Sequence, residues 1–253
     1  MAITNRWTIR MKTQVNIMSK YQRTDGRDAD GIRPMEAKVG VIPQADGSAM
    51  FKIGNTIAYA AVYGPRELYP RFLQNPETGI LRCNYNMMPF SGAGDRVRPG
   101  ANRRSKEISM VTENALRPVI DLHDCPNAVV DVFIELPQTD AGSRCAGITA
   151  AAMALADAGI AMRDMVSAIA VGRIGDGSYV DLSYEEEALE DYPVADIPMA
   201  FVNRTGEVTL LQMDGEVQTE GIMDALAKGR EACKRIHALQ TQALKNKFQG
   251  DTQ

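Results

Sequence analysis

The spacing of apolar residues changes several times along this chain, and that succession limits the folds open to it. Between residues 35 and 63 apolar positions alternate roughly every second residue, a pattern typical of half-buried strands. From Ser105 they recur at helical spacing, and the Ala-rich run 144–158 is also predicted to be helical. The last long segment, 218–246, carries one apolar face and is predicted to be an amphipathic helix.

The other segments indicate strands, so the predicted order is strands, helix, strand, helix, strands, helix. A stretch rich in Gly, Arg and Pro, 91–104, is predicted to be a loop. This order is typical of an α+β fold in which helices cover the sheets. The predicted strands are 35–43, 48–53, 56–63, 80–88, 128–136, 166–174, 178–183, 198–203 and 207–214.

Size and composition indicate a folded globular chain. It has 253 residues, 45% of them hydrophobic and 24% charged, which suits a full core and disfavours disordered or fibrous classes. We expect one domain over 20–246, whose halves near 20–135 and 136–246 no linker divides. Residues 1–19 are interpreted as a frayed extension or an interaction arm, and 247–253 as a C-terminal tail.

Cysteine and histidine usage disfavours a structural zinc site. The four cysteines are scattered without a C-x-x-C pair, and there are only two histidines. Reduced, mostly buried thiols are typical of a cytoplasmic protein. The apolar runs are too short for a membrane span, and the first twenty residues lack the apolar core of a signal peptide. We therefore expect a cytoplasmic protein without membrane contact.

Two adjacent arginines, Arg103 and Arg104, are predicted on the loop just before a helix. Cations near a helix N-terminus oppose the helix dipole, at a cost of roughly 0.3–1 kcal/mol. A bound anion would reverse that sign, whereas a solvated surface is the plain alternative. Because the net charge of the chain is −4, these cations are a local feature and not part of a coat for duplex nucleic acid.

Gly142-Ser143-Arg144 marks the start of the Ala-rich helix. Glycine permits close backbone approach, Ser143 offers a hydroxyl, and the first N–H groups of a helix are free to bind an anion. The alternative is that Ser143 is a simple helix cap. A cap would explain the serine but neither the glycine nor the arginine, so the segment is a candidate phosphate site.

Among the carboxylates of residues 181–196, Asp196 differs from its neighbours. It lies against an apolar run, 197–201, at a predicted strand start, whereas the other acids look like a solvated loop. A carboxylate in that position can hold Mg²⁺ or donate a proton.

A turn near the start of the predicted domain carries three arginines, Arg23, Arg27 and Arg33, around Asp25-Gly26. The Asp-Gly pair favours a tight turn. We interpret these arginines as structural, pairing with acids of the fold.

Together these segments resemble the RNase PH superfamily of phosphorolytic exoribonucleases, and within it the catalytic ring subunits of the archaeal RNA exosome. The resemblance runs from about residue 20 to 246, and it rests on the shared order and spacing of short motifs. These motifs are Arg23-Thr-Asp-Gly-Arg27, Gln44-Ala-Asp-Gly-Ser48, Gly54-Asn55-Thr56, Tyr63-Gly-Pro-Arg-Glu67, Asn102-Arg-Arg-Ser105, Ala141-Gly-Ser-Arg144, Ala154-Leu-Ala-Asp-Ala-Gly159 and Ala195-Asp-Ile-Pro198.

The resemblance implies two similar β-α units packed into one domain. It also implies a hexameric ring, a trimer of heterodimers in which this subunit alternates with a catalytically silent paralogue, beneath a cap of RNA-binding subunits. The implied activity is phosphate-dependent 3′→5′ degradation of single-stranded RNA, with inorganic phosphate as co-substrate, nucleoside 5′-diphosphates as products, reversal at high diphosphate, and Mg²⁺ as the expected metal.

The resemblance also implies roles for individual residues. Asp196 corresponds to the catalytic aspartate and is a possible metal ligand, while a second acid a few positions earlier is either Glu190 or Asp191. The remaining roles are phosphate binding for Gly142, Ser143 and Arg144, and RNA binding for Arg66, Arg103 and Arg104.

Three rival functions remain at this point. One is a non-catalytic RNA-binding ring subunit, which the joint presence of Asp196, the arginine pair and the Gly142-Ser143-Arg144 segment disfavours. Another is a standalone RNase PH that trims transfer-RNA 3′ ends. The third, a two-metal hydrolytic nuclease, lacks the clustered carboxylates expected for that chemistry.

Overall fold

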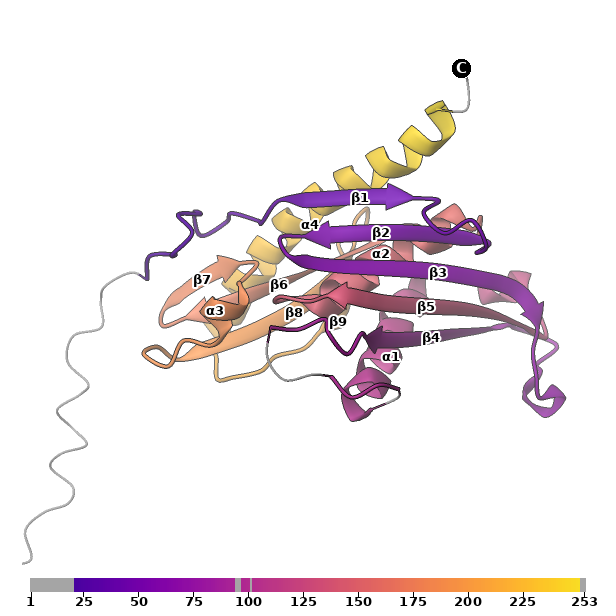
Figure 1. Ribbon diagram of the computed structural model, residues 1–253, viewed down its shortest axis with the longest axis horizontal. Coiled ribbons are helices and arrows are strands. Elements are labelled where there is room, and N and C mark those ends of the chain that lie inside the picture. Colours follow the sequence, from indigo (N-terminus) through magenta and orange to yellow (C-terminus); the bar gives the residue numbers. More distant parts are fainter. Residues whose placement is uncertain (1–20, 94–96, 101, 251–253) are drawn as a thin grey trace, which may run out of the picture.

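The chain folds into two sheets with helices between and around them (Figure 1). The computed structural model describes residues 21–93, 97–100 and 102–250, so the predicted extension over 1–19 lies outside the described residues. In chain order the strands are β1 (Met35–Val39), β2 (Gly47–Ile53), β3 (Thr56–Glu67), β4 (Ile80–Met87), β5 (Ala128–Gln138), β6 (Val166–Ile174), β7 (Gly177–Val180), β8 (Val194–Val202) and β9 (Val208–Leu211).

The helices alternate with the strands as the α+β prediction required. The α-helices are α1 (Arg103–Leu116), α2 (Ser143–Asp157), α3 (Tyr184–Glu187) and α4 (Thr219–Gly250), and the 3-10 helices are η1 (Arg71–Leu73), η2 (Arg117–Val119) and η3 (Leu122–Asp124). Strands β1 to β5 form a sheet in the order β1-β2-β3-β5-β4, and β6 to β9 form another in the order β7-β6-β8-β9. Each sheet is followed or covered by helices, which confirms the predicted pair of β-α units.

One strand pair of the first sheet is parallel, and it determines where the helices begin. Strands β4 and β5 run side by side in the same direction, with Met87 opposite Leu136 at their carboxyl ends. The loops that follow remain in contact, because Thr139 donates its backbone N–H to the Ser91 carbonyl at 2.7 Å. The chain therefore enters α1 and α2 from the same end of the sheet.

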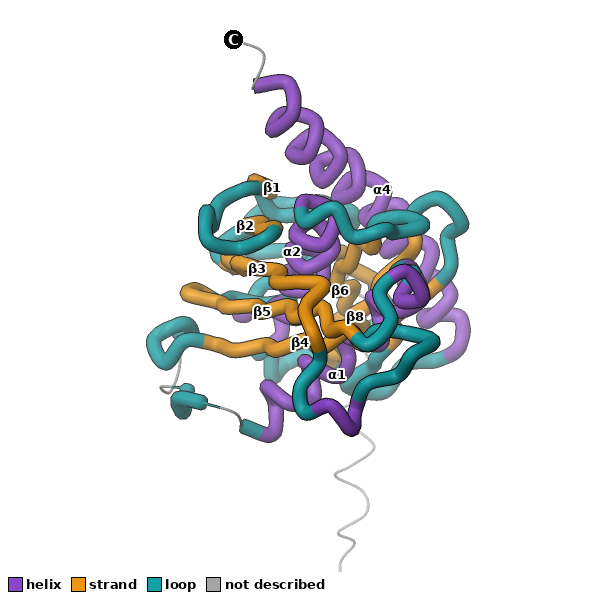
Figure 2. Tube along the Cα trace, turned by 90° about the vertical axis from the view of Figure 1, so that its right-hand side faces the viewer, coloured by secondary structure: helices purple, strands orange, loops and turns teal. Residues whose placement is uncertain are grey.

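Helix α2 is the centre of the core. It packs against β2 and β3 of the first sheet and against β6 of the second, and Figure 2 shows it between the two sheets. From Cys145 to Leu155 every residue of α2 is buried. A helix that is apolar on all sides must be covered on all sides, so the Ala-rich composition lets two sheets approach one helix closely. Helix α1 covers β4, and α4 covers β6 and β1.

The observed element bounds differ from the predicted ones mainly in the second half. Strand β8 begins at Val194 and thus includes Asp196, whereas β9 ends at Leu211. Beyond β9, Asp214 still pairs with Asp196 through two backbone hydrogen bonds of 2.9 Å. Helix α4 continues to Gly250, past residue 246, where the tail was expected to begin.

Candidate active site

Helix α1 begins at the two arginines themselves. The Asn102 side chain accepts from the Ser105 N–H at 2.8 Å, and the Ser105 hydroxyl accepts from the Asn102 N–H at 2.9 Å. Because this reciprocal cap forms at Asn102, Arg103 and Arg104 occupy the first turn of the helix and not the loop predicted for them. Both are exposed, and neither forms an ion pair with a described residue. Their alignment with the helix dipole is unfavourable, and no ion pair with a described residue offsets it.

The turn that opens α2 has the form of an anion site. Gly142 precedes the helix with φ of 69°, a left-handed conformation that favours glycine. Ser143 is the first helical residue, it is buried, and no side chain caps this end of the helix. The alternative that Ser143 is an N-cap is therefore wrong. Its hydroxyl and the free N–H groups of the first turn remain available to a ligand.

Arg144 carries the positive charge of this turn. It is half-buried, and its guanidinium donates to Gln212 Oε1 at 2.6 Å. No ion pair with a described residue neutralises it. A guanidinium outside any direct ion pair, next to free backbone donors, is the arrangement expected where an anion binds.

Asp196 faces this turn from strand β8. Burial raises the pKa of Asp196 to about 6, Arg144 acts against the rise, and Asp214 adds to it. Its Oδ1 atom is buried and has no hydrogen-bond partner among the described residues. A buried carboxylate oxygen without a partner is costly, so it marks a position where a proton, a ligand or a cation is accommodated.

A second acid, Glu187, interacts electrostatically with Asp196, and it is neither of the two candidates named from the sequence. Burial raises the pKa of Glu187 to about 7, the charge of Asp196 adds to the rise, and Arg33 and Arg104 oppose it. Glu190 and Asp191 are both exposed and form no hydrogen bond or ion pair with the described residues.

The acidic run contains a helix cap that was not predicted from the sequence, and this cap positions Glu187. Ser183 and Glu186 form a reciprocal capping box that opens the four-residue helix α3. The following residue, Glu187, is then fixed at the end of this helix and not in a solvated loop.

The site charges thus form one connected group. The charge of Arg144 lowers the pKa of Asp196. The charge of Asp196 raises the pKa of Glu187, and the charge of Arg104 lowers it. Arg103 lies on the same helical turn as Arg104 but is not linked to this group by any recorded contact. The structure therefore brings together residues from α1, α2, α3 and β8 that lie far apart in the sequence.

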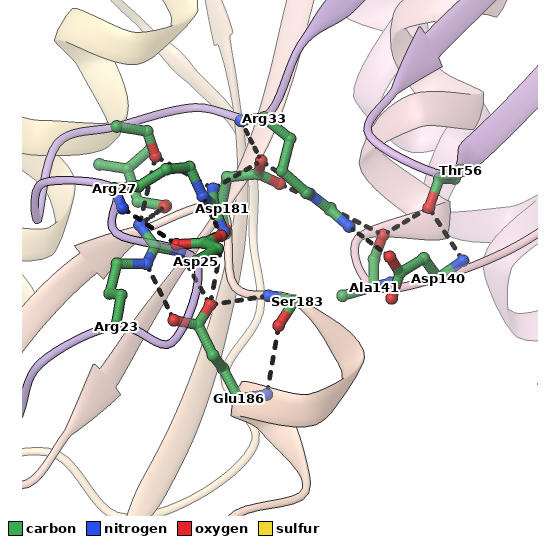
Figure 3. Close-up of polar contacts among 12 residues, drawn as sticks. Arg23, Asp25, Arg27, Arg33, Thr56, Asp140, Ala141, Asp181, Ser183 and Glu186 are labelled. Carbon is green, nitrogen blue, oxygen red and sulfur yellow. Dashed lines mark hydrogen bonds and ion pairs between the residues drawn. The ribbon is translucent and has the colours of Figure 1, made fainter.

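A buried arginine holds the loops of this group in place (Figure 3). Arg33 binds Asp181 through its Nε and one terminal nitrogen at 2.9 and 2.7 Å. It also reaches Asp140 at 3.1 Å and the Ala141 carbonyl at 3.3 Å. Thr56 donates to the same carbonyl at 2.8 Å. The residues just before Gly142 are therefore tied to the second sheet through Arg33.

The neighbouring arginine anchors the acidic helix. Arg23 binds both carboxylate oxygens of Glu186 at 2.8 Å and the carbonyls of Val180 and Asp181 at 2.9 and 2.7 Å. Both side chains of the ion pair are almost completely buried, at 1% and 2% exposure. The prediction that the arginines of 23–33 pair with acids of the fold is confirmed, and one of their partners, Glu186, directly precedes Glu187.

Two family models match the chain in succession, 3′ exoribonuclease family domain 1 over residues 31–161 and domain 2 over residues 164–232. The chain belongs to the RNase PH family of 3′ exoribonucleases. The boundary between the two matches falls between α2 and β6, so each RNase PH domain contains one of the two sheets.

Relatives within the RNase PH family cover nearly the whole chain. A protein of Methanopyrus kandleri named exosome complex component Rrp41 is 45% identical over 90% of this chain and 94% of its own length. One of the same name from Nitrosopumilus maritimus is 41% identical over 96% and 98%. The crystal structure of rice Rrp46 matches with a TM-score of 0.76 at 25% identity, over 88% of this chain and 100% of that one. The resemblance to an archaeal exosome subunit of the RNase PH type is confirmed.

Arg66 lies away from the group that the RNase PH fold assembles at the helix starts. It is near the end of β3, paired in register with Val129 at the start of β5, whereas the helices begin beyond the end of β5. Arg66 is exposed, its guanidinium lies 4.7 Å from the centre of the Tyr63 ring, and Asp46 is 3.5 Å away. Any contact of Arg66 with a ligand is therefore separate from the site around Asp196.

The carboxylates of the site suit a weakly held divalent ion. Among the described residues no three His, Cys, Asp or Glu side chains gather into a metal site. Mg²⁺ is usually held by one or two carboxylates together with water and substrate phosphates. Asp196, with its unpartnered Oδ1, and Glu187 fit that mode.

No helix in the described ranges is long and apolar enough to cross a membrane.

The raised pKa values of the two acids predict a pH dependence of stability. Asp196 and Glu187 titrate at about 6 and about 7 when folded, against ordinary values of 3.8 and 4.5. Between these limits the folded state binds more protons than the unfolded state, so their contribution to the free energy of unfolding falls as pH rises from about 4 to about 7. We expect Asp196→Asn, which buries no charge, to gain up to about 2 kcal/mol over the wild type between about pH 4.5 and about pH 8.

Urea unfolding of both proteins at the two pH values measures this difference. If the two proteins differ in their free energy of unfolding by the same amount at both pH values, Asp196 ionises at its ordinary pKa.

Proposed function

We propose that this chain is the phosphorolytic 3′→5′ exoribonuclease subunit of an exosome core. The observation that supports this most is the grouping of Arg104, Ser143 and Arg144 with two half-buried acids of raised pKa, Asp196 and Glu187. Cationic donors without protein counter-ions suit a phosphate and a phosphodiester. Acids with raised pKa values suit proton transfer near neutral pH.

The reaction we propose joins inorganic phosphate to the last nucleotide of an RNA. A phosphate oxygen attacks the phosphorus of the terminal phosphodiester, and the bond to the 3′-oxygen of the preceding nucleotide breaks. The products are a nucleoside 5′-diphosphate, whose β-phosphate was the inorganic phosphate, and an RNA one nucleotide shorter. Since the bond made is a phosphoanhydride, abundant nucleoside diphosphate would reverse the reaction.

The arginines would serve to bring two anions together. Phosphate and phosphodiester repel each other, and phosphoryl transfer depends on positioning and charge neutralisation more than on covalent chemistry. Gly142, Ser143 and Arg144 would hold the phosphate at the start of α2, while Arg103 and Arg104 would hold the RNA backbone at the start of α1. Each guanidinium acts more strongly where burial excludes water.

Asp196 would protonate the departing 3′-oxygen, and Glu187 is the second acid of the site in place of Glu190 or Asp191. A pKa of about 6 leaves part of Asp196 protonated near neutral pH. If Mg²⁺ is bound, the ionised carboxylates of Asp196 and Glu187 would hold it. The ion would then supply neutralisation of phosphate charge and an acidic water as the proton source in place of the Asp196 carboxyl group.

The substrate we propose is single-stranded RNA of any sequence. Contacts to the backbone from Arg103, Arg104 and, farther along the strand, Arg66 do not distinguish bases, and they make binding strongly salt-dependent. The 2′-hydroxyl is the group that would distinguish RNA from DNA.

Partners follow from the relatives' names and remain part of the proposal. Proteins similar to this chain are named components of the exosome complex. We propose that this subunit alternates with a catalytically silent paralogue in a hexameric ring capped by RNA-binding subunits. Co-purification of such a paralogue in equal amount would distinguish this assembly from a standalone RNase PH.

Replacement of Arg144 tests the phosphate site. Arg144→Ala removes a charge-assisted donor, typically worth roughly 1.5–3 kcal/mol. We expect the phosphate concentration for half-maximal release of nucleoside diphosphate from oligo(A) to rise by about tenfold to a hundredfold.

The matched control is Arg163→Ala, an exposed arginine in the turn between α2 and β6. It should leave the phosphate dependence unchanged. If Arg144→Ala behaves like Arg163→Ala, phosphate binds elsewhere.

A further inference from the structure

Tyr85 on strand β4 is a buried residue that the proposed mechanism has not used. It is 3% exposed, and its ring lies against α2 at Gly147. A Cβ atom at position 147 would come within 3.3 Å of the Tyr85 ring. The missing side chain of Gly147 thus makes room for an aromatic ring against the helix, one turn after Ser143.

The Tyr85 hydroxyl is buried. Among the described residues it contacts the Ser143 side chain, but no group meets the distance and angle of a regular hydrogen bond with it. Buried hydroxyls are nearly always paired, and one left unpaired in the folded protein is destabilising. The cost of an unpaired buried hydroxyl is tolerated where a ligand supplies the missing partner. Strained or unsatisfied groups therefore concentrate at functional sites.

The surroundings of Tyr85 indicate the charge of that ligand. Burial raises the pKa of Tyr85, whereas the contact with the Ser143 side chain and the positive charges of Arg104 and Arg144 oppose the rise. The phenol therefore stays protonated, as a donor, next to two cations and the Ser143 hydroxyl. A group that accepts hydrogen bonds and carries negative charge is the complement to this set.

There is space beside the ring for such a group. A cavity of about 90 Å³ lies between β4 and the start of α1, and Tyr85 and Arg104 both line it. The other lining residues are Met87, Val97, Asn102 and Ser105. The cavity thus lies at the end of β4 and the start of α1.

We propose that the Tyr85 hydroxyl donates a hydrogen bond to the inorganic phosphate held at the start of α2, as a donor additional to Ser143 and Arg144. This inference rests on the proposed phosphorolytic function for its reaction, but binding of phosphate itself can be measured without turnover. Tyr85 supplies a neutral donor that no described protein group pairs with in regular hydrogen-bond geometry, and an anion at the start of α2 would accept its proton.

Substitution by phenylalanine separates a ligand contact from a structural one. Tyr85→Phe should raise the phosphate concentration for half-maximal release of nucleoside diphosphate by about tenfold, the value of one hydrogen bond to a charged group, with little change in the maximal rate. The melting temperature without phosphate should be equal to or higher than that of the wild type, because an unpaired buried hydroxyl is removed.

Tyr179→Phe is the matched control. Tyr179 is also 3% exposed, but its hydroxyl donates to the Tyr21 carbonyl at 2.9 Å. This variant should melt at a lower temperature and keep the wild-type phosphate dependence.

Thermal shift with inorganic phosphate is the second measurement, in the wild type and both variants. The phosphate-induced rise in melting temperature should be smaller in Tyr85→Phe than in the other two proteins. An equal rise, or a loss of stability in Tyr85→Phe like that of Tyr179→Phe, would overturn the proposal. If the wild type releases no nucleoside diphosphate, the proposed function fails, while the thermal shift still decides the role of Tyr85.

Discussion

Asp196→Asn is expected to abolish phosphate-dependent release of nucleoside diphosphates from single-stranded RNA. Asparagine preserves the shape of the side chain but cannot give a proton to the departing 3′-oxygen. Loss of a general acid typically costs about 10²–10⁴ in rate. The variant should fold and assemble normally, because its backbone pairing with Asp214 does not involve the side chain. Turnover on oligo(A) with saturating phosphate measures the effect.

The same substitution at neighbouring acids locates the second carboxyl group. Glu187→Gln should lower turnover strongly, since Glu187 interacts with Asp196 and Arg104. Asp191→Asn should retain activity, since Asp191 is exposed and outside this group. Wild-type turnover in Asp196→Asn would refute the role of that residue. Loss of activity in Asp191→Asn, with activity kept in Glu187→Gln, would favour Asp191, one of the two candidates predicted from the sequence.

Arg33→Met is expected to be strongly destabilising. It removes the guanidinium that binds Asp181, a carboxylate only 3% exposed, and that also reaches Asp140. Breaking a buried ion pair by removing one partner typically costs about 3–5 kcal/mol, because the other charge stays buried without its partner. Arg27, 3.4 Å from the Asp181 carboxylate, remains as a more distant counter-ion, so we expect a loss near the lower end of that range. The free energy of unfolding in urea measures this loss. Activity should fall as well, because the residues preceding Gly142 lose their tie to the second sheet.

Arg82→Met is the matched control for the arginine substitution. Arg82 pairs with Asp131 on the sheet surface, where its side chain is 49% exposed. An exposed pair contributes roughly 0–1 kcal/mol, so this variant should be nearly as stable as the wild type. A double variant, Arg33→Met with Asp181→Asn, should be more stable than the sum of the two single changes implies. Additive losses, or equal losses at positions 33 and 82, would contradict the role given to Arg33.

The type and order of the elements could be predicted from the sequence, because periodicity reports which face of a segment is buried. Strand partners and directions could not. The alternation in 80–88 and 128–136 is the same for a parallel as for an antiparallel pair, yet the parallel pairing of β4 with β5 is what brings the starts of α1 and α2 together.

The candidate site was predictable where a residue was out of place for its local structure. Arg103 and Arg104 oppose a helix dipole, and Gly142 precedes a helix without a capping side chain, so each could be singled out from the sequence alone. Glu187 could not, because it stands among similar acids, and only the burial of Glu186 against Arg23 shows which way α3 faces. Tyr85 looked like any alternating core residue of a strand.

Tracing the phosphate tests the proposed chemistry most directly. Wild-type protein, together with its co-purifying partners, would be incubated with oligo(A) and radiolabelled inorganic phosphate, and the products separated. Phosphorolysis predicts that the label appears in the β-position of nucleoside diphosphate, one for each nucleotide removed. Unlabelled nucleoside monophosphates formed without need for phosphate would show hydrolysis. That result, or no degradation at all, would contradict the phosphorolytic site assigned to Arg144, Asp196 and their neighbours.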